Sequence, residues 1–311
     1  MSKKEEAEYE EYESLKNSKF KQQKLPGWRP VPSMGRTLVI YFGFGIIFVG
    51  LGVLILLFSN NIVEYNEDYC KDQSAKSCII EFNITKKMEP NIMVYYKIDG
   101  FYQNHRRYMK SKSDKQLEGK DISEEEAEVC EPVITNEQMG KDKSIDKKDL
   151  VGKDISIPCG LMAKSFFNDT FIFKYINDTN VTVNETNIAR KSDKEKYKNV
   201  NLSRQWINLE ENEHFMVWMK PSPLPNFKKL WGRIETQLDA NTTIKVEIEN
   251  NYNVSSLISP NATKHLIITT VNNFGGKNTF LAIGCLILGG VCLILGIIFF
   301  IGFKLAAKKE K

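Results

Sequence analysis

The sequence predicts a two-span α-helical membrane protein with a large, mainly antiparallel β-sandwich domain on the exoplasmic side. Two long uncharged apolar stretches lie near the chain ends, the segment between them alternates strand-like runs with turns, and every Asn-x-Ser/Thr sequon falls within that segment. The expected order is a cytosolic tail over residues 1–36, a transmembrane helix over 37–59, an exoplasmic domain over 60–278, a second transmembrane helix over 279–303 and a cytosolic tail over 304–311.

The two apolar stretches are hidden in the average composition. The chain of 311 residues is 42% hydrophobic and has a formal net charge of +4, which is ordinary for a soluble protein. However, Thr37–Ser59 and Thr279–Phe303 contain 23 and 25 residues without a charge, and about 20 such residues span a bilayer core. The first stretch is longer than the apolar part of a cleaved signal peptide, so we expect it to be retained. A soluble enzyme and a multi-pass transporter are therefore excluded.

Basic residues flank both stretches on the side of the chain ends. Residues 17–36 contain five Lys or Arg and no acid, and residues 304–311 contain four Lys against one Glu. By the positive-inside rule, both termini are expected in the cytosol. The segment between the stretches carries 31 basic and 32 acidic residues, so the net positive charge reflects topology and gives no support for nucleic-acid binding.

Glycosylation sequons provide an independent test of this orientation. Chance predicts about three Asn-x-Ser/Thr triplets in a chain of this composition, whereas nine occur and none lies in a tail. This excess favours a luminal or extracellular position for the segment. The candidate glycosylation sites are Asn83, Asn168, Asn177, Asn180, Asn184, Asn201, Asn241, Asn253 and Asn261.

Four of the six cysteines lie in the exported segment, namely Cys70, Cys78, Cys130 and Cys159. An even number of cysteines in an oxidising compartment indicates disulfides, for which three pairings are possible. We favour the sequential pairs, Cys70–Cys78 and Cys130–Cys159. A zinc site is disfavoured because the cysteine spacings and the three His residues match no ligand motif.

The exported segment is expected to form short strands. In Thr243–Glu249 apolar and polar residues alternate with a period of two, as in a strand with one buried face. Looser runs of the same kind occur at Cys78–Ile84, Ile92–Ile98, Phe171–Ile176, Phe215–Met219 and His265–Val271. Apolar residues from Phe227 to Ile234 instead fall at helical spacing after three prolines, which predicts a short amphipathic helix that covers the core.

Motifs for catalysis are missing from the sequence. There is no Gly-x-Ser-x-Gly, His-Glu-x-x-His or phosphate-loop motif, and we expect no cofactor and no metal. The six acids of Asp121–Glu131 are expected to form a solvated loop. A catalytic pair of carboxylates could still be brought together by the fold from distant parts of the sequence. The sequence therefore argues against an enzyme without disproving one.

Small residues recur along one face of each apolar stretch. Cys285, Gly289, Cys292 and Gly296 share one helix face, and Gly45, Gly52 and Ser59 repeat at heptad spacing. Small residues let helices approach closely in lipid, so these faces pack either on each other or on another protein. Neither stretch contains an Asp, Glu, Lys, Arg or His residue that could form a proton relay or an ion site.

Several segments together resemble one known family. They are Phe20–Pro30, Ser59–Ile62, Gly100–Leu117, Cys130–Pro132, Pro158–Gly160, Ser165–Thr170, Phe215–Met219, Leu224–Leu230 and Gly275–Leu281. In their order and position they are similar to the cell division control protein 50 family, also called the ligand-effect modulator 3 or transmembrane protein 30 family. Its members are the non-catalytic β-subunits of type IV P-type ATPases, which are phospholipid flippases.

The resemblance implies an accessory subunit that forms a heterodimer with such an ATPase. It implies that the subunit is needed for folding, exit from the endoplasmic reticulum and activity of the ATPase, which moves aminophospholipids or other phospholipids to the cytosolic leaflet. It also implies an integral membrane protein of the endoplasmic reticulum, the Golgi or endosomes, or the plasma membrane.

Candidate contacts with this partner follow from the matching segments. Phe20, Leu25, Pro26 and Trp28 would lie along its cytosolic domains, Gly289 and Gly296 would pack on a helix, and Tyr102, Gln103, His105, Arg106 and Arg107 would meet its luminal loops. The alternative role for the last group is an internal brace of the β-sandwich.

Two other functions remain as alternatives. A two-span ligand-gated channel shares internal termini and a glycosylated, disulfide-bonded ectodomain. Such channels usually need a polar or charged pore-lining face, for which Thr279–Phe303 offers only Gly, Thr and Cys. A cell-surface adhesion or receptor protein would have its partner outside the cell.

Overall fold

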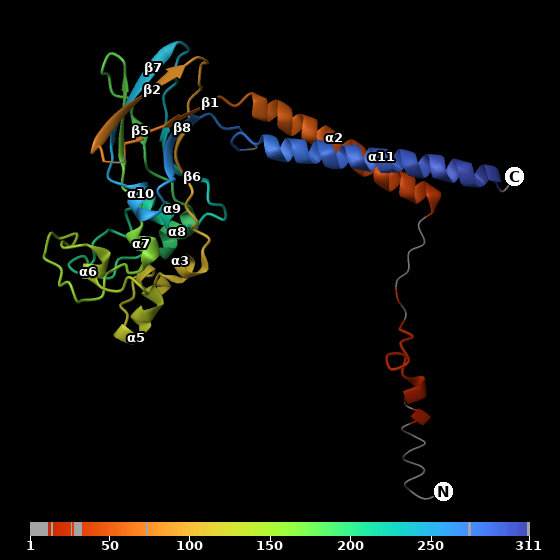
Figure 1. Ribbon diagram of the computed structural model, residues 1–311, viewed down its shortest axis with the longest axis horizontal. Helices are drawn as coiled ribbons and strands as arrows, with labels where there is room; N and C mark the ends of the chain where they lie inside the picture. The colour runs from red at the N-terminus through yellow and green to blue at the C-terminus, as the bar shows by residue number, and fades with distance from the viewer. Residues whose placement is uncertain are drawn as a thin grey trace, which may run out of the picture. The chain divides into compact units, whose positions relative to one another are not determined.

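The computed structural model describes residues 12–13, 15–25, 27, 33–72, 74–272 and 275–309, and it contains two compact units (Figure 1). One unit holds most of the two long helices, α2 (Met34–Asn60) and α11 (Thr279–Lys309). The other unit comprises residues 55–279 and contains all the strands.

Helices α2 and α11 have the length and composition of membrane spans. Only 17% and 11% of the residues in their most apolar windows are buried. A core helix of a soluble protein would be mostly buried, so this exposure favours a lipid environment. The helices begin or end a few residues beyond the expected spans, and the domain limits at 37, 59, 279 and 303 stay predictions.

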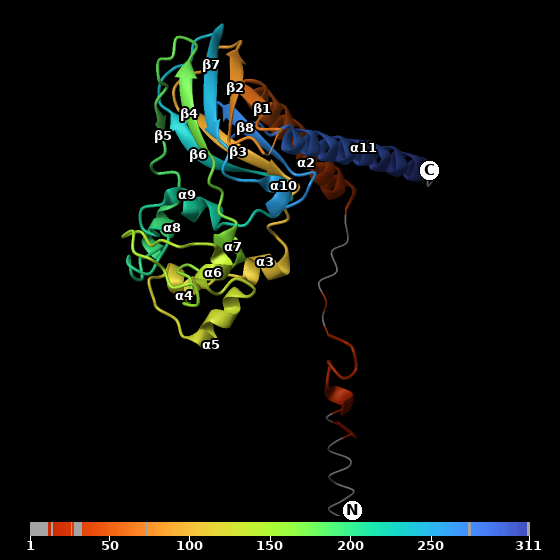
Figure 2. The same ribbon diagram turned by 60° about the vertical axis from the view of Figure 1, so that its left-hand side comes forward.

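Residues 55–279 form two antiparallel sheets, both visible in Figure 2. The five-stranded sheet has the order β1 (Glu64–Asp68), β8 (Thr263–Thr269), β3 (Ile92–Asp99), β6 (Phe227–Ile234) and β5 (Val183–Asn184). The three-stranded sheet has the order β2 (Ser77–Ile84), β7 (Thr242–Glu249) and β4 (Thr170–Tyr175). All of these pairings are antiparallel, which confirms the predicted fold class.

The two sheets enclose one hydrophobic core. Residues Phe82, Phe173 and Val246 of the small sheet and Val94 and Leu266 of the large sheet are buried in the same cluster. The rings of Phe171 on β4 and Trp231 on β6 meet edge to face, with 4.9 Å between their centroids. This geometry is favourable for aromatic pairs, and it joins the two layers of the sandwich.

Five of the six expected strands are present, as β2, β3, β4, β7 and β8. The sixth prediction is wrong, because Phe215–Met219 lies largely within helix α9 (Glu213–Trp218). The side chain of Asn212 caps this helix by accepting a hydrogen bond from the backbone N–H of Phe215 at 2.8 Å. The aromatic and β-branched composition favoured a strand, but the cap and the buried face of the helix decide its conformation.

The predicted amphipathic helix at Phe227–Ile234 is also wrong, because this segment is strand β6. The register of β6 against β3 shifts between Val94 and Tyr95, which inserts Trp231 as a bulge. A bulge changes which side of a strand faces the core. Trp231 and Ile234 are therefore both buried although they lie three positions apart. Buried residues at this spacing are typical of a helix, which is why the sequence pattern predicted one.

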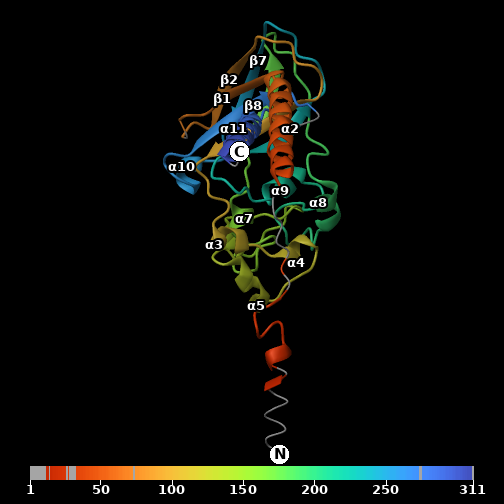
Figure 3. The same ribbon diagram turned by 90° about the vertical axis from the view of Figure 1, so that its right-hand side faces the viewer.

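Short helices gather at one end of the sandwich (Figure 3). We call residues 101–165 and 187–226 the helical lobe. It contains α3 (Arg106–Lys110), α4 (Asp114–Leu117), α5 (Glu124–Ala127), η1 (Glu128–Cys130), α6 (Asn136–Met139), α7 (Leu161–Lys164), α8 (Lys191–Lys196) and α9, while α10 (Val254–Leu257) precedes β8. The acidic run Asp121–Glu131 is therefore not only a loop, since a capping box between Ser123 and Glu126 starts α5 within it.

Candidate partner-binding surface

The segment Gly100–Leu117 is divided between the interior and the surface of the helical lobe. Tyr102, His105, Arg106 and Arg107 are exposed, whereas Gln103, Tyr108, Ser111 and Gln116 are buried. The buried residues hold the lobe together, and the exposed residues are available to a partner. The structure thus separates residues that the sequence could not tell apart.

Gln103 is a brace rather than a contact residue. Its side-chain oxygen accepts a hydrogen bond from the backbone N–H of Ser222 at 3.0 Å. The neighbouring Asn104 donates to the carbonyl oxygen of Pro223 at 2.9 Å. These bonds tie the loop around residues 100–104 to the proline-rich loop of residues 221–226, so the two loops form one surface.

Two apolar side chains project from the joined loops. Tyr102 is 62% exposed and Leu224 is 65% exposed. Tyrosine and arginine are enriched among the residues that dominate protein interfaces, and the neighbouring leucine adds exposed apolar area. Leu224 was missed as a candidate because a single leucine between prolines gives no signal in the sequence, although it begins the matching segment Leu224–Leu230.

Charge on this surface is cationic and unpaired. Among the described residues no acidic side chain forms an ion pair with Arg106 or Arg107. In the same lobe Lys112 pairs with Asp114 at 2.7 Å. Partial burial raises the pKa of Asp114, but the hydrogen bond and charge of Lys112 outweigh it, so the net shift is downward.

The disulfide Cys130–Cys159 lies beneath this surface. The hydroxyl of Ser111 donates to the carbonyl oxygen of Cys130 at 2.8 Å and accepts from the N–H of Leu161 at 2.8 Å. Gln116 accepts from the N–H of Cys159 at 2.9 Å. Buried side chains of the same segment that exposes the arginines therefore fix both ends of the disulfide.

Gly160 allows this close approach. Its φ is +105°, and an added Cβ would lie 2.2 Å from the carbonyl oxygen of Ser111. Only glycine satisfies both the backbone angle and the space. The segment Pro158–Gly160 is thus part of the brace around the disulfide.

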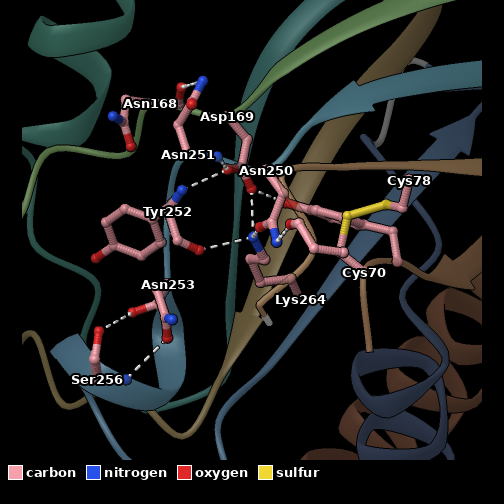
Figure 4. Close-up of polar contacts among 12 residues, drawn as sticks. Cys70, Cys78, Asn168, Asp169, Asn250, Asn251, Tyr252, Asn253, Ser256 and Lys264 are labelled. Atoms are coloured by element: carbon pink, nitrogen blue, oxygen red, sulfur yellow. Dashed lines mark hydrogen bonds and ion pairs between the residues drawn. A yellow bond between two sulfur atoms is a disulfide. The ribbon is translucent and has the colours of Figure 1, made fainter. Parts of the chain in front are cut away.

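The second disulfide, Cys70–Cys78, closes a loop next to a buried polar cluster on the sandwich (Figure 4). We call Tyr69, Asp169, Asn250, Tyr252 and Lys264 the Asp169 cluster. The ammonium of Lys264 contacts the carboxylate of Asp169 at 2.6 Å, and both side chains are 0% exposed. Asn250 connects the cluster to the disulfide loop by donating to the carbonyl oxygen of Ala75 at 2.6 Å.

All the charges of the Asp169 cluster are satisfied. The carboxylate accepts from the hydroxyl of Tyr69 at 2.9 Å and from the N–H groups of Asn251 and Tyr252 at 2.7 Å each. The ammonium of Lys264 also donates to the Asn250 side chain and to the carbonyl oxygen of Tyr252. Burial lowers the pKa of Lys264, although the carboxylate of Asp169 opposes the shift. The arrangement is structural and joins β4, β7 and β8.

Lys229 is a further buried cation that the sequence did not reveal. Its ammonium donates to the carbonyl oxygens of Val217 at 3.1 Å, Trp218 at 3.2 Å and Lys220 at 2.5 Å. These oxygens lie at the carboxyl end of α9, where a cation is favourable. Burial lowers the pKa of Lys229 to about 7. Lys229 therefore attaches the lobe to β6.

The sequons differ in accessibility. Asn83, Asn168, Asn177, Asn180, Asn201, Asn241 and Asn261 are exposed. Asn184 and Asn253 are partly buried, and their side chains are occupied: Asn184 donates to Glu235 at 2.6 Å, and Asn253 caps α10. No sequon occurs between Asn83 and Asn168, a segment that includes α3 to α7.

The remaining candidate contacts lie in the tail and the long helices. Phe20 and Leu25 are 75% and 59% exposed, whereas Pro26 and Trp28 lie outside the described residues. A Cβ on Gly289 would come within 2.8 Å of Val49, and one on Gly296 within 3.3 Å of Phe42. Both glycines therefore face α2. This corresponds to the possibility that the two apolar helices pack on each other, rather than on another protein.

The described residues contain no group of three His, Cys, Asp or Glu side chains placed to hold a metal ion. What the structure offers is a braced lobe with an exposed apolar and cationic surface. Such a surface is suited to binding another protein.

Comparison with known proteins gives one consistent family. The model of the LEM3 (ligand-effect modulator 3) family / CDC50 family matches residues 2–309. ALA-interacting subunit 3 of Arabidopsis thaliana is 35% identical over 94% of this chain and 87% of its own length. Cell cycle control protein 50A of Bos taurus is 32% identical over 91% of this chain and 87% of its own length.

A third relative carries a functional name. It is the phospholipid-transporting ATPase accessory subunit CDC50 of Chaetomium thermophilum, which is 32% identical over 73% of this chain and 60% of its own length. The family model covers nearly the whole chain, and the resemblance seen in the sequence segments is confirmed. This protein is therefore a member of the LEM3/CDC50 family and an integral membrane protein with two apolar helices and a β-rich domain.

Proposed function

We propose that this protein is the non-catalytic accessory subunit of a phospholipid-transporting ATPase of the type IV P-type class, with which it forms a heterodimer. The near-complete family match, together with a relative named as an accessory subunit of such an ATPase, carries the proposal. ATP hydrolysis and the movement of phospholipid to the cytosolic leaflet then take place in the partner.

The fold suits a supporting role. Two disulfides, the Asp169 cluster and the braces of the lobe stabilise the domain, and its buried charged groups Asp169, Lys264 and Lys229 are hydrogen-bonded. A domain of this kind can cover the exoplasmic loops of a membrane pump without itself performing chemistry. It can also stabilise the pump during folding and exit from the endoplasmic reticulum.

The orientation is part of the proposal. Both termini lie in the cytosol, and residues 60–278 are exoplasmic and glycosylated at the exposed sequons. The complex leaves the endoplasmic reticulum for the Golgi, endosomes or the plasma membrane. The basic residues beside both spans and the location of all nine sequons between them support this arrangement.

The contact surface on the exoplasmic side is centred on the joined loops of the lobe. Tyr102 and Leu224 supply apolar contact, and His105, Arg106 and Arg107 supply polar contact with the partner's loops. On the cytosolic side, the tail segment that includes Phe20, Leu25, Pro26 and Trp28 lies along the partner. The exposure of Tyr102, Leu224 and the arginines supports the exoplasmic surface.

Affinity purification of the full chain from its own cells in mild detergent, followed by mass spectrometry, tests the proposal. We expect one type IV P-type ATPase in equal amount with this chain. A homo-oligomer without an ATPase, together with ionic current after expression of this chain alone, would support a two-span channel instead. Recovery of a ligand from outside the cell would support an adhesion or receptor protein.

A further inference from the structure

Two open clefts adjoin each other on the helical lobe, with α3 on one side and α5 and η1 on the other. Their volumes are about 480 Å³ and about 370 Å³. Lys110 and Val129 line both clefts, so the two form one continuous groove. We call it the α3–η1 groove and define it by Arg107, Met109, Lys110, Glu128, Val129 and Glu131.

The two walls of the groove carry opposite charges that do not pair with each other. Arg107 and Lys110 are exposed on α3, and Glu128 and Glu131 are exposed at η1. None of these four side chains takes part in an ion pair within the part of the chain that the structure describes. Farther along the first cleft Lys115 does pair with Glu126 and Lys112 with Asp114, so the unpaired charges are confined to the part of the groove around Arg107, Lys110, Glu128 and Glu131.

Apolar side chains lie in the groove with these charges. Val129 is 54% exposed and Met109 is 38% exposed. An occupant that covers them would remove apolar surface from water, and the charges on the two walls would fix its direction. No sequon lies on any element of the groove, so no glycan is attached within it.

We propose that the α3–η1 groove binds an exoplasmic loop of the partner ATPase that carries a cationic and an anionic side chain next to an apolar residue. The anionic side chain pairs with Arg107 and Lys110, the cationic side chain pairs with Glu128 and Glu131, and the apolar residue covers Val129. This inference rests on the proposed function and specifies the chemistry of the partner segment.

A protein loop fits the groove better than a small ligand does. Small-molecule sites are concave and enclose most of the ligand's surface. The α3–η1 groove is open along its length and has charged walls, as in the polar rim of a protein interface. Charge complementarity therefore points to a peptide segment with both signs of charge.

Site-specific photo-crosslinking tests the proposal directly. A photoreactive amino acid replaces Val129 in the full chain, and the matched control replaces Val151, which is 60% exposed on the same lobe outside the groove. We expect the probe at position 129 to label one exoplasmic ATPase loop that contains both signs of charge, and the probe at position 151 to label that loop weakly or not at all.

The other outcomes are distinguishable. If the ATPase co-purifies but the probe at position 129 labels lipid, a second copy of this chain or nothing, the groove proposal is overturned while the proposed function stands. If no ATPase co-purifies with the unmodified chain, both are overturned. A similar degree of labelling from positions 129 and 151 would also contradict a specific groove.

Charge reversal provides a second test. Each exposed ion pair contributes at most about 1 kcal/mol, or roughly fivefold in affinity. Lys110→Glu or Glu128→Lys removes such a pair and adds a repulsion of similar size, so it should reduce the affinity for the ATPase, and with it ATPase recovery, by up to roughly 30-fold. Lys153→Glu makes the same charge change on an exposed lysine outside the groove and should leave recovery unchanged. An unchanged recovery for both groove variants, with normal folding, would overturn the proposal.

Discussion

The β-sandwich and the helical lobe are stabilised in different ways. Three of the four eight-residue strands of the sandwich, β2, β3 and β7, alternate between more and less buried residues, and β3 does so along its whole length. The helices of the lobe contain only three to six residues, and isolated helices so short do not form in water. The sandwich therefore depends mainly on a distributed apolar pattern, whereas the lobe depends on a disulfide, helix caps and individual hydrogen bonds.

This difference indicates where single substitutions should act and where function resides. A pattern of many apolar residues tolerates small changes at one position, whereas a brace made by one side chain does not. The lobe uses its buried side chains as braces and leaves Tyr102, Arg106 and Arg107 free at the surface. Each prediction below tests one part of this contrast.

The largest effect is expected at the Asp169 cluster, where the sandwich depends on specific polar atoms as well as on its apolar pattern. Lys264→Met removes the cation from the Asp169 cluster and leaves a buried carboxylate without its partner. The free energy of unfolding should fall by about 3–5 kcal/mol, measured from the unfolding midpoint of the full chain in detergent. Lys71→Met, at an exposed lysine of the neighbouring loop, should change it little. Equal effects of the two substitutions would show that the cluster is dispensable.

The next effect separates the lobe from the sandwich. Cys130→Ser opens a disulfide whose cysteines are 29 residues apart, against 8 residues for Cys70–Cys78. The free energy of unfolding should fall by about 3–4 kcal/mol, which is roughly 1 kcal/mol more than for Cys70→Ser. Hydrogen exchange should accelerate in α3 to α7 and stay slow in β3 and β7.

The same Cys130→Ser variant is expected to keep the complex in an early secretory compartment. A lobe that is loosened cannot present its surface, although the sandwich is intact. Uniform loss of exchange protection over both regions would contradict their separate stabilisation. Normal delivery to the destination membrane would contradict the importance of the lobe for assembly.

Gly160→Ala adds one methyl group where Gly160 lies close to Ser111, and so tests the brace around the disulfide Cys130–Cys159. The new methyl group would clash with the carbonyl oxygen of Ser111, and the positive φ adds strain. We expect the free energy of unfolding to fall by about 2–4 kcal/mol. Gly140→Ala is the matched control, because Gly140 also has a positive φ but nothing lies within 4 Å of its added Cβ. The free energy of unfolding of that variant should fall by only about 1–2 kcal/mol. Similar decreases at both positions would show that the clash with Ser111 contributes nothing.

Glu213 gives a prediction with a pH dependence. It accepts hydrogen bonds from the N–H groups of Asn187 and Ala189, and Lys194 forms an ion pair with it. Burial raises its pKa, but the bond to Lys194 and the backbone bonds outweigh it, so the pKa lies below its usual 4.5. A depressed carboxyl pKa stabilises the fold above the unfolded pKa, and this contribution is lost as the pH falls through the folded pKa.

Glu213→Gln should therefore destabilise the protein by about 1–2 kcal/mol at neutral pH. The difference from the wild type should shrink as the pH falls through and below about 4.5. Unfolding midpoints measured over this pH range provide the test, with the exposed Glu195→Gln as control. A difference that is constant with pH would mean that the charge of Glu213 is not involved.

The smallest effect on stability is expected at the exposed arginines. Arg106→Ala with Arg107→Ala should change the free energy of unfolding by less than about 0.5 kcal/mol, because neither side chain has an ionic partner in the described residues. Recovery of the ATPase with this double variant should nevertheless fall. A large loss of stability would indicate an internal brace, and undiminished recovery with normal lipid transport would contradict a contact role.

The sandwich could be predicted from the sequence to the extent that its strands alternate regularly. β7 shows a clear period of two and was expected within one residue of its observed start. β6 was taken for a helix because the bulge at Trp231 and the buried Lys229 break the alternation. Such features depend on a partner strand and a distant helix end, which a local pattern does not contain.

The candidate site was predictable only in part, for a similar reason. The segment Gly100–Leu117 could be singled out, but its sequence does not show that Gln103 and Ser111 point inward while Arg106 points outward. That division arises from contacts with residues 130, 159–161 and 222, which are distant in the chain. Leu224 joins the surface through the same long-range bonds.

The central claim is that this chain serves the folding and transport activity of a phospholipid-transporting ATPase. Depletion of the chain from its own cells, with measurement of the location of the ATPase and the uptake of fluorescent phospholipid, tests it most directly. We expect the ATPase to remain in the endoplasmic reticulum and uptake to fall, and the wild-type chain to restore both. Normal delivery of the ATPase and unchanged uptake without this chain would contradict the claim.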